Sequence, residues 1–202
     1  MILNLPQADQ RNYFISAYFE GCAYFLTPGP SSLSSVFGGP PPVTISGISG
    51  TILQPEKLHY VGRISQHDIP ALGRHISEIP LFYGFTFDGC ELWYEVDSSS
   101  RINLMDLDPA RPLIDYPYPD YPPILPLIPL RLGDKQRMTY AKFSTAYPNL
   151  EENQPADLVV ALPPVVSHGI SLWGTSGDGN DVTVVFEYDF DERTVRAYNR
   201  CT

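Results

Sequence analysis

The sequence has few cysteines and no long apolar run, and both scarcities limit where the protein can work. Its three cysteines, Cys22, Cys90 and Cys201, form no CxxC pair. This count fits a reducing compartment, although one disulfide beside one free thiol stays open. No segment approaches the roughly 20 apolar residues of a membrane span, and residues 1–14 lack the basic stretch and apolar run of a secretion signal. We therefore expect a cytoplasmic protein without a membrane anchor.

Basic residues are scarce as well. The chain has 13 Lys and Arg against 23 Asp and Glu, which gives a formal net charge of −10. Such a surface repels the phosphates of nucleic acids and of anionic lipids, so neither nucleic acid nor a membrane is an expected partner. The field favours a basic protein partner or a cationic ligand. The simpler alternative is that negative charge keeps a tyrosine-rich surface in solution.

Proline and tyrosine, in contrast, are abundant, with 21 and 13 residues. Each proline removes an amide donor and restricts the residue before it, so long helices are not expected. Tyrosine and phenylalanine suit the half-buried surface of a sheet. A length of 202 residues fits one domain. We predict a single mainly β domain over residues 1–202, with β-roll or barrel-like antiparallel sheets and one or two short helices.

Two aromatic segments predict β-hairpins. In residues 12–27, two aromatic runs flank Glu20-Gly21, where glycine tolerates the positive φ of a tight turn. A helix over residues 7–19 is the alternative, because several of its aromatic residues also share one helical face. In residues 80–96, PLFYGFTFDGCELWYEV, the pair Asp88-Gly89 favours a type I′ turn between two strands.

The rest of the chain predicts short strands and two helical segments. Residues 57–64 and 158–162 are typical of strands, and residues 182–190 turn back into a final strand. We expect a helical turn over Asp68–His75, with Asp68 as its N-cap. A helix is expected over residues 134–147, with Asp134 as its N-cap.

Two proline-rich segments lie between these elements. Residues 27–43, TPGPSSLSSVFGGPPPV, have the composition of a loop. We interpret this loop as scaffolding, because a phosphate-binding loop would need GxxxxGK[ST] before a helix. Residues 113–132 contain so many prolines that we expect a polyproline or edge strap and no central strand. Its PxxP spacings suit SH3-type ligands, but its Ile and Leu side chains favour packing on the domain's own core.

The segments SSVFGGPPPV, LHYVGRISQHDIPAL, LFYGFTFDGCELWYEV and WGTSGDGNDVTVVFEYDFDE follow one another along the chain. In this order they resemble the bacterial YwqG-like proteins, a family known mainly as a domain of unknown function. The chain departs from the family pattern at Arg63, where glutamine is common, and at Thr175, where aspartate is common. It also lacks the usual Trp-Pro after the first motif. The resemblance implies a roll-like, mainly β single domain and brings no established activity.

No motif for catalysis or metal binding is recognised. His59, His67 and His75 recur every eight residues beside Asp68, but the chain would have to fold back for several ligands to converge on one ion. A G-x-S-x-G nucleophile elbow is absent, and residues 178–181 lack the spacing of a calcium loop. We expect no metal and no cofactor.

Two functions from different classes remain. The first is a non-enzymatic protein of the immunity or antitoxin type, which masks a basic protein partner with one acidic strand face and nearby tyrosine anchors. Its predicted contact residues are Glu187, Asp189, Asp191 and Glu192. The alternative is a small-molecule-binding or hydrolase-like enzyme with a pocket lined by His67, Asp68, Trp93 and Trp173. The non-enzyme ranks first because no catalytic motif is present, and we expect a monomer or a small homo-oligomer.

Overall fold

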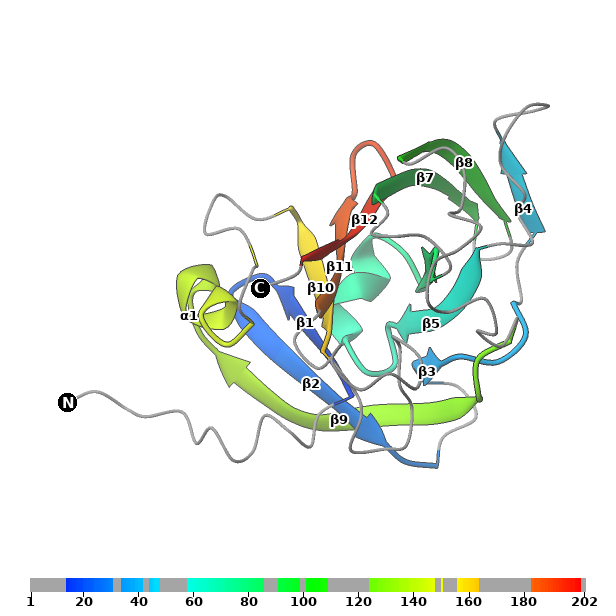
Figure 1. Ribbon diagram of the computed structural model, residues 1–202. Coiled ribbons are helices and arrows are strands. Elements are labelled where there is room, and N and C mark those ends of the chain that lie inside the picture. Colours follow the sequence, from blue (N-terminus) through cyan, green and yellow to red (C-terminus); the bar gives the residue numbers. More distant parts are fainter. Residues whose placement is uncertain are drawn as a thin grey trace.

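The computed structural model describes residues 14–30, 34–41, 44–47, 58–85, 91–98, 101–108, 124–147, 150, 156–163 and 183–200. Within these ranges, twelve strands form one sheet that curls on itself (Figure 1). This confirms the prediction of a mainly β, barrel-like fold. The strands are β1 (Ile15–Phe19), β2 (Cys22–Pro28), β3 (Val36–Phe37), β4 (Thr44–Gly47), β5 (His59–Ser65), β6 (Glu78–Tyr83), β7 (Glu91–Ser98), β8 (Arg101–Asp108), β9 (Ile128–Arg137), β10 (Leu158–Leu162), β11 (Thr183–Asp189) and β12 (Thr194–Arg200).

The order of strands across the sheet is β4-β8-β7-β12-β11-β10-β1-β2-β9-β3-β5-β6. Neighbouring strands are antiparallel, except that β4 and β8 run parallel. The late strands β10, β11 and β12 lie between the N-terminal hairpin and β7 (Figure 1). Strands from the two ends of the described chain therefore share the centre of one sheet.

The N-terminal hairpin of β1 and β2 is confirmed. Its turn residues Glu20 and Gly21 both have positive φ, at 48° and 73°, as a type I′ turn requires. The helical alternative is wrong over Ile15–Phe19, and residues 7–13 lie outside the described residues. Cys22, the first residue of β2, is a free thiol.

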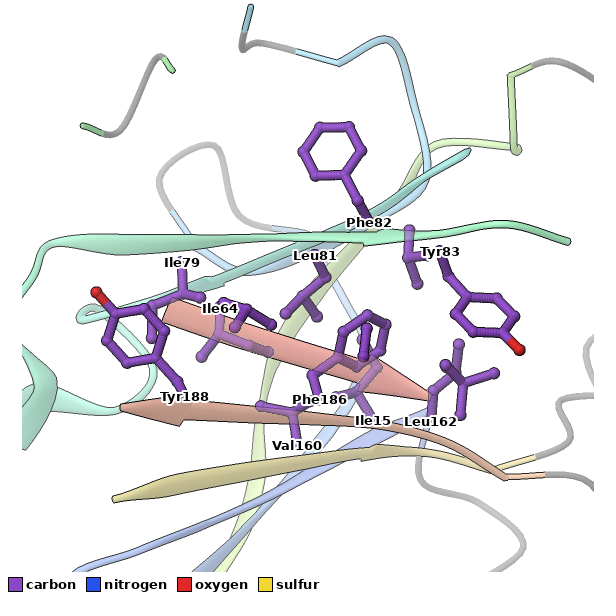
Figure 2. Close-up of a cluster of buried hydrophobic side chains, with 14 of the residues drawn as sticks. Ile15, Ile64, Ile79, Leu81, Phe82, Tyr83, Val160, Leu162, Phe186 and Tyr188 are labelled. Atoms are coloured by element: carbon purple, nitrogen blue, oxygen red, sulfur yellow. The ribbon is translucent and has the colours of Figure 1, made fainter. Parts of the chain in front are cut away.

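The sheet buries apolar side chains on both of its faces. On the inner face, Ile79 and Leu81 of β6 point toward Val160 of β10 and Phe186 of β11 (Figure 2). On the opposite face, a second cluster forms beside the short helix α1 (Tyr140–Ser144) and contains Tyr18, Phe25, Tyr140, Phe143, Tyr147, Val159, Ala161, Val185 and Tyr198. The predicted buried strand over residues 158–162 is confirmed as β10, which is buried on both faces because it lies between these two clusters.

The hairpin predicted over residues 80–96 is wrong. Both of its strands exist, but β6 pairs with β5, whereas β7 pairs with β8 and β12. The two strands meet across the curl, where the Tyr94 hydroxyl donates to the Pro80 carbonyl (2.9 Å) and accepts from the Phe82 amide (3.2 Å). The Asp88-Gly89 turn lies outside the described residues.

The proline-rich strap predicted over residues 113–132 is wrong at its C-terminal end. Residues 128–132 belong to β9, which pairs with β2 and with β3 inside the sheet. Pro129 fits because it is the second residue of the strand, and its carbonyl still accepts from the Gly29 amide (3.0 Å). Residues 113–123 lie outside the described residues.

The helix predicted over residues 134–147 is also wrong in its extent. β9 continues to Arg137, and Asp134 lies within it, so the α-helix is limited to α1. The N-cap of α1 is Thr139, whose hydroxyl accepts from the Lys142 amide (3.3 Å). No helix in the described ranges is long and apolar enough to cross a membrane.

The segment around Gly38 acts as scaffolding, as interpreted from the sequence, although Val36–Phe37 forms strand β3 where a loop was expected. The Gly38 amide donates to the Val61 carbonyl (2.8 Å), and the Gly39 amide donates to the Leu125 carbonyl (2.9 Å). Both glycines have positive φ, and a Cβ at Gly38 would collide with the Pro126 carbonyl. Glycine is therefore required for this close approach.

Candidate functional site

The structure does not gather the three histidines. His59 is buried in β5, while His67 is exposed in the turn that follows. His75 follows the 3₁₀ helix η3 (Pro70–Arg74) and stacks on Phe190, with ring centroids 4.2 Å apart. Among the residues that the structure describes, no three His, Cys, Asp or Glu side chains form a group that could hold a metal ion.

Asp68 does not cap η3, whose N-cap is Ile69, so that prediction is wrong. Its buried carboxylate instead joins two parts of the sheet. Oδ2 accepts from the Ser35 amide (2.7 Å), just before β3, and Oδ1 accepts from the Leu132 amide (3.0 Å) in β9. The Ser35 hydroxyl in turn accepts from the Ser65 amide (3.0 Å). Because backbone donors occupy both oxygens, Asp68 is a structural clamp and a poor candidate for the acid or base of a pocket.

Nothing in the described residues places either tryptophan of the predicted pocket beside Asp68. Trp93 lies on β7, where it pairs with Arg196 of β12 across the sheet. Its side chain is half-buried. Trp173 lies outside the described residues. The candidate site is therefore the surface around Trp93 and not the turn at His67.

The four predicted contact carboxylates lie near the end of β11 and in the turn after it. Asp189, Asp191 and Glu192 are exposed, whereas the Glu187 side chain is only 17% exposed. Asp189 Oδ1 accepts from the Glu192 amide (2.9 Å), which stabilises the turn. The alternating residues Val184, Phe186 and Tyr188 are buried in the inner core, as the strand periodicity predicted.

Strand pairing extends this acidic stretch across the neighbouring strands. Glu187 lies opposite Arg196 of β12, Arg196 opposite Trp93 of β7, and Trp93 opposite Asp106 of β8. Cross-strand partners point to the same side of a sheet. The residues two positions before and after each of these partners point to that side as well. We call this surface the outer acidic face; it comprises Glu91, Trp93, Glu95, Asp106, Asp108, Glu187, Asp189, Arg196 and Tyr198.

Arg196 lies at the centre of the outer acidic face. Its Nε donates to Glu91, and its Nη1 lies 3.4 Å from Glu187 Oε2. Its guanidinium carbon lies 4.6 Å from the Tyr198 ring centroid and 5.9 Å from the Trp93 ring centroid, within the range of cation–π contacts. Burial opposes the charged form, but the hydrogen bond to Glu91 and the charges of both carboxylates raise the pKa of Arg196. Arg196 therefore holds these side chains in fixed positions.

Within the described ranges, no comparable cation pairs with the remaining carboxylates of this face. Asp106, Asp108 and Asp189 are exposed, and Glu95 is partly exposed. The residues named for the outer acidic face include six carboxylates and one guanidinium, that of Arg196, which contacts two of them, Glu91 and Glu187. The face therefore carries a net negative charge that solvent and a partner can reach.

The tyrosines near this face are not the exposed anchors that we predicted. Tyr188 points into the inner core. Tyr198 is 3% exposed, and its hydroxyl donates a hydrogen bond to Glu187 Oε1 (2.9 Å). Trp93 is the partly exposed aromatic side chain of the face. Large aromatic side chains of this kind are enriched among the residues that dominate binding energy in interfaces.

Sequence reasoning missed the part of this face that lies on β7 and β8. The alternation in residues 91–97, ELWYEVD, already places Glu91, Trp93 and Glu95 on one side of a strand. It was assigned to a hairpin with β6, so these residues were not connected to Glu187. The missing information was that β12 lies between β11 and β7.

Comparisons of the chain with protein-family models, curated proteins and solved structures found no match. The resemblance to the YwqG-like family stays a prediction that rests on the four sequence segments.

Proposed function

We propose that the protein is a non-enzymatic binding protein that masks a basic protein partner with its outer acidic face, as an immunity or antitoxin protein would. The observation that supports this proposal is the surplus of carboxylates around the half-buried Trp93 on four adjacent strands. A surface of one sign attracts and orients a partner of the opposite sign, chiefly by increasing the association rate. The whole chain, at −10, adds to the same attraction.

The arrangement also supports specificity. The hydrogen bonds of Arg196 to Glu91 and Glu187 fix the centre of the face before a partner arrives. A fixed surface loses less conformational entropy on binding than a mobile one. We expect the exposed carboxylates to steer the partner, while Trp93 contributes most of the short-range contact energy.

The test is capture of a partner from the source cell's lysate, followed by native mass spectrometry at low and high salt. We would compare the wild type with a variant of the face, E95Q/D106N/D108N, and with a control, E20Q/E78Q/D134N, which removes three carboxylates that lie outside this face. We expect one stoichiometric basic protein with the wild type and the control. The face variant and high salt should both release it.

A second variant separates contact from steering. Trp93→Ala should weaken the captured complex by about 30-fold, mainly through faster dissociation. Capture of no stoichiometric protein, or equal capture by the face variant and the control, would refute the proposal.

A further inference from the structure

A β-bulge in β8 turns two consecutive side chains toward the outer acidic face. The register of β8 against β7 shifts at Trp93, which pairs with Asp106, and Met105 is the extra residue. Leu104 and Leu107, on either side of these two residues, are both buried in the inner core. Met105 and Asp106 therefore both point outward, although consecutive residues of an unbroken strand point to opposite sides.

Met105 brings an exposed apolar side chain to this face. It is 50% exposed, and it lies across from the partly exposed Trp93 of β7. The other exposed large apolar side chains of the described residues lie outside the four strands of the face; they are Ile124, Leu127 and Leu132. Methionine and tryptophan are both enriched at the centres of protein interfaces. The bulge therefore makes an apolar contact point that solvent and a partner can reach.

Asp106 adds a carboxylate beside this contact point. Its Oδ1 accepts from the Leu107 amide (2.8 Å), which orients the carboxylate. None of the ion pairs between described residues involves Asp106. Asp108, two positions further along the same side of β8, is exposed as well. Uncompensated negative charge thus lies next to exposed apolar surface.

The other flank of Trp93 shows which side chain fits such surroundings. There, on the β12 side, the Arg196 guanidinium carbon lies 5.9 Å from the Trp93 ring centroid, while its Nε donates to Glu91. The β8 side offers the same two kinds of group, the tryptophan ring and the carboxylate of Asp106. On this side, no cation of the described chain forms an ion pair with that carboxylate.

We propose that the basic partner of the outer acidic face places an arginine side chain on the bulge, against Trp93 and Met105 and beside Asp106. The planar guanidinium packs against the exposed part of the Trp93 ring and donates to the Asp106 carboxylate. Its methylene stem lies on the Met105 side chain. A lysine ammonium fits less well, because it is compact and strongly hydrated and has no flat face. This inference rests on the function proposed above and names the side chain that the partner contributes.

The first test uses three peptides of the form acetyl-Gly-X-Gly-amide as probes, in which X is arginine, lysine or citrulline. Citrulline keeps the shape of arginine but carries no charge. NMR follows the Met105 methyl and Trp93 indole resonances, which the variants Met105→Leu and Trp93→Phe identify. The arginine peptide should shift both resonances with saturation and bind about 2–5-fold more tightly than either of the other peptides. Equal affinity for the arginine and citrulline peptides, or no saturation at these two resonances, would overturn the proposal.

The second test compares two variants of equal charge. Met105→Lys places a cation of the chain's own beside Asp106 and should abolish saturable binding of the arginine peptide. The control, Ile124→Lys, adds the same charge at a 54% exposed position outside the face and should bind the peptide like the wild type. Both positions are exposed, so both variants should fold. Equal binding of the peptide by the two variants would contradict the assignment.

Partner capture separates this inference from the masking function. If the Met105→Lys protein captures the basic partner as well as the wild type does, while E95Q/D106N/D108N does not, the masking function stands and the arginine contact is refuted. Loss of capture with Met105→Lys, but not with Ile124→Lys, supports both.

Discussion

The clamp formed by Asp68 makes a quantitative prediction about stability. Its carboxylate oxygens accept from the amides of Ser35 (2.7 Å) and Leu132 (3.0 Å), which belong to segments far apart in the sequence. A hydrogen bond to a charged group contributes about 1.5–3 kcal/mol. The Ser35 amide is fully buried, so its contribution should lie near the upper value; Leu132 is 36% exposed, so water can replace part of its bond. We therefore expect Asp68→Ala to lower the free energy of unfolding by about 3–5 kcal/mol.

Urea denaturation followed by circular dichroism measures this loss. Asp68→Asn keeps one acceptor oxygen and should lose about half as much free energy of unfolding as Asp68→Ala. The control is Asp134→Asn, because this partly exposed carboxylate also makes two hydrogen bonds, but to its near neighbours Lys135 and Gln136. It should cost less than about 1 kcal/mol. An Asp68→Ala protein that loses under about 1 kcal/mol with an unchanged m value would show that the clamp is not a stabilising contact.

Three further predictions concern backbone geometry and buried hydroxyls. Tyr94→Phe should lower the free energy of unfolding by about 1–3 kcal/mol, because the buried Phe82 amide would lose its acceptor; chemical denaturation measures this. Gly38→Ala should cost more than about 2 kcal/mol, whereas Gly21→Ala should cost about 1 kcal/mol. Both glycines have positive φ, but only Gly38 lacks room for a Cβ, so equal losses for the two would contradict the close approach at Gly38. Burial raises the pKa of Tyr94 and Tyr188 above the ordinary value of 10.0. Since the unfolded chain then ionises first, the contribution of these two tyrosines to stability should be constant below about pH 9 and be lost as the pH rises through 10 and above. A Tyr94→Phe/Tyr188→Phe protein that loses stability above pH 10 as steeply as the wild type would be inconsistent with this burial.

The sequence was a good guide wherever a structure depends on near neighbours. The turn at Glu20-Gly21 joins two adjacent strands, and the turn after Asp189 does the same, so local composition was enough to predict both hairpins. The buried strand over residues 158–162 was equally clear, because a short apolar run is required where both faces are covered.

The errors arise where the partner of a segment lies far away in the sequence. Residues 80–83 and 91–96 each have the pattern of a strand, but that pattern does not say that β6 pairs with β5 and β7 with β12. The strap was misjudged for the same reason. Its last residues form a sheet strand because β2 and β3 supply partners on both sides of Ile128–Leu130.

The same limit applies to the sites. Glu187 and Asp189 lie on one face of β11, as the alternation predicted, whereas Asp191 and Glu192 lie in the turn after it; Arg196, which neutralises Glu187, was not identified.

The central position of β10 has a consequence for synthesis. β1 is buried along its whole length, and its second neighbour, β10, begins only at Leu158. While the ribosome is still making the intervening chain, the N-terminal hairpin presents an unpaired apolar edge, which is a site for misassociation between nascent chains. Chains that end before residue 158 should therefore aggregate, and chaperone binding should persist until the last strands leave the ribosome.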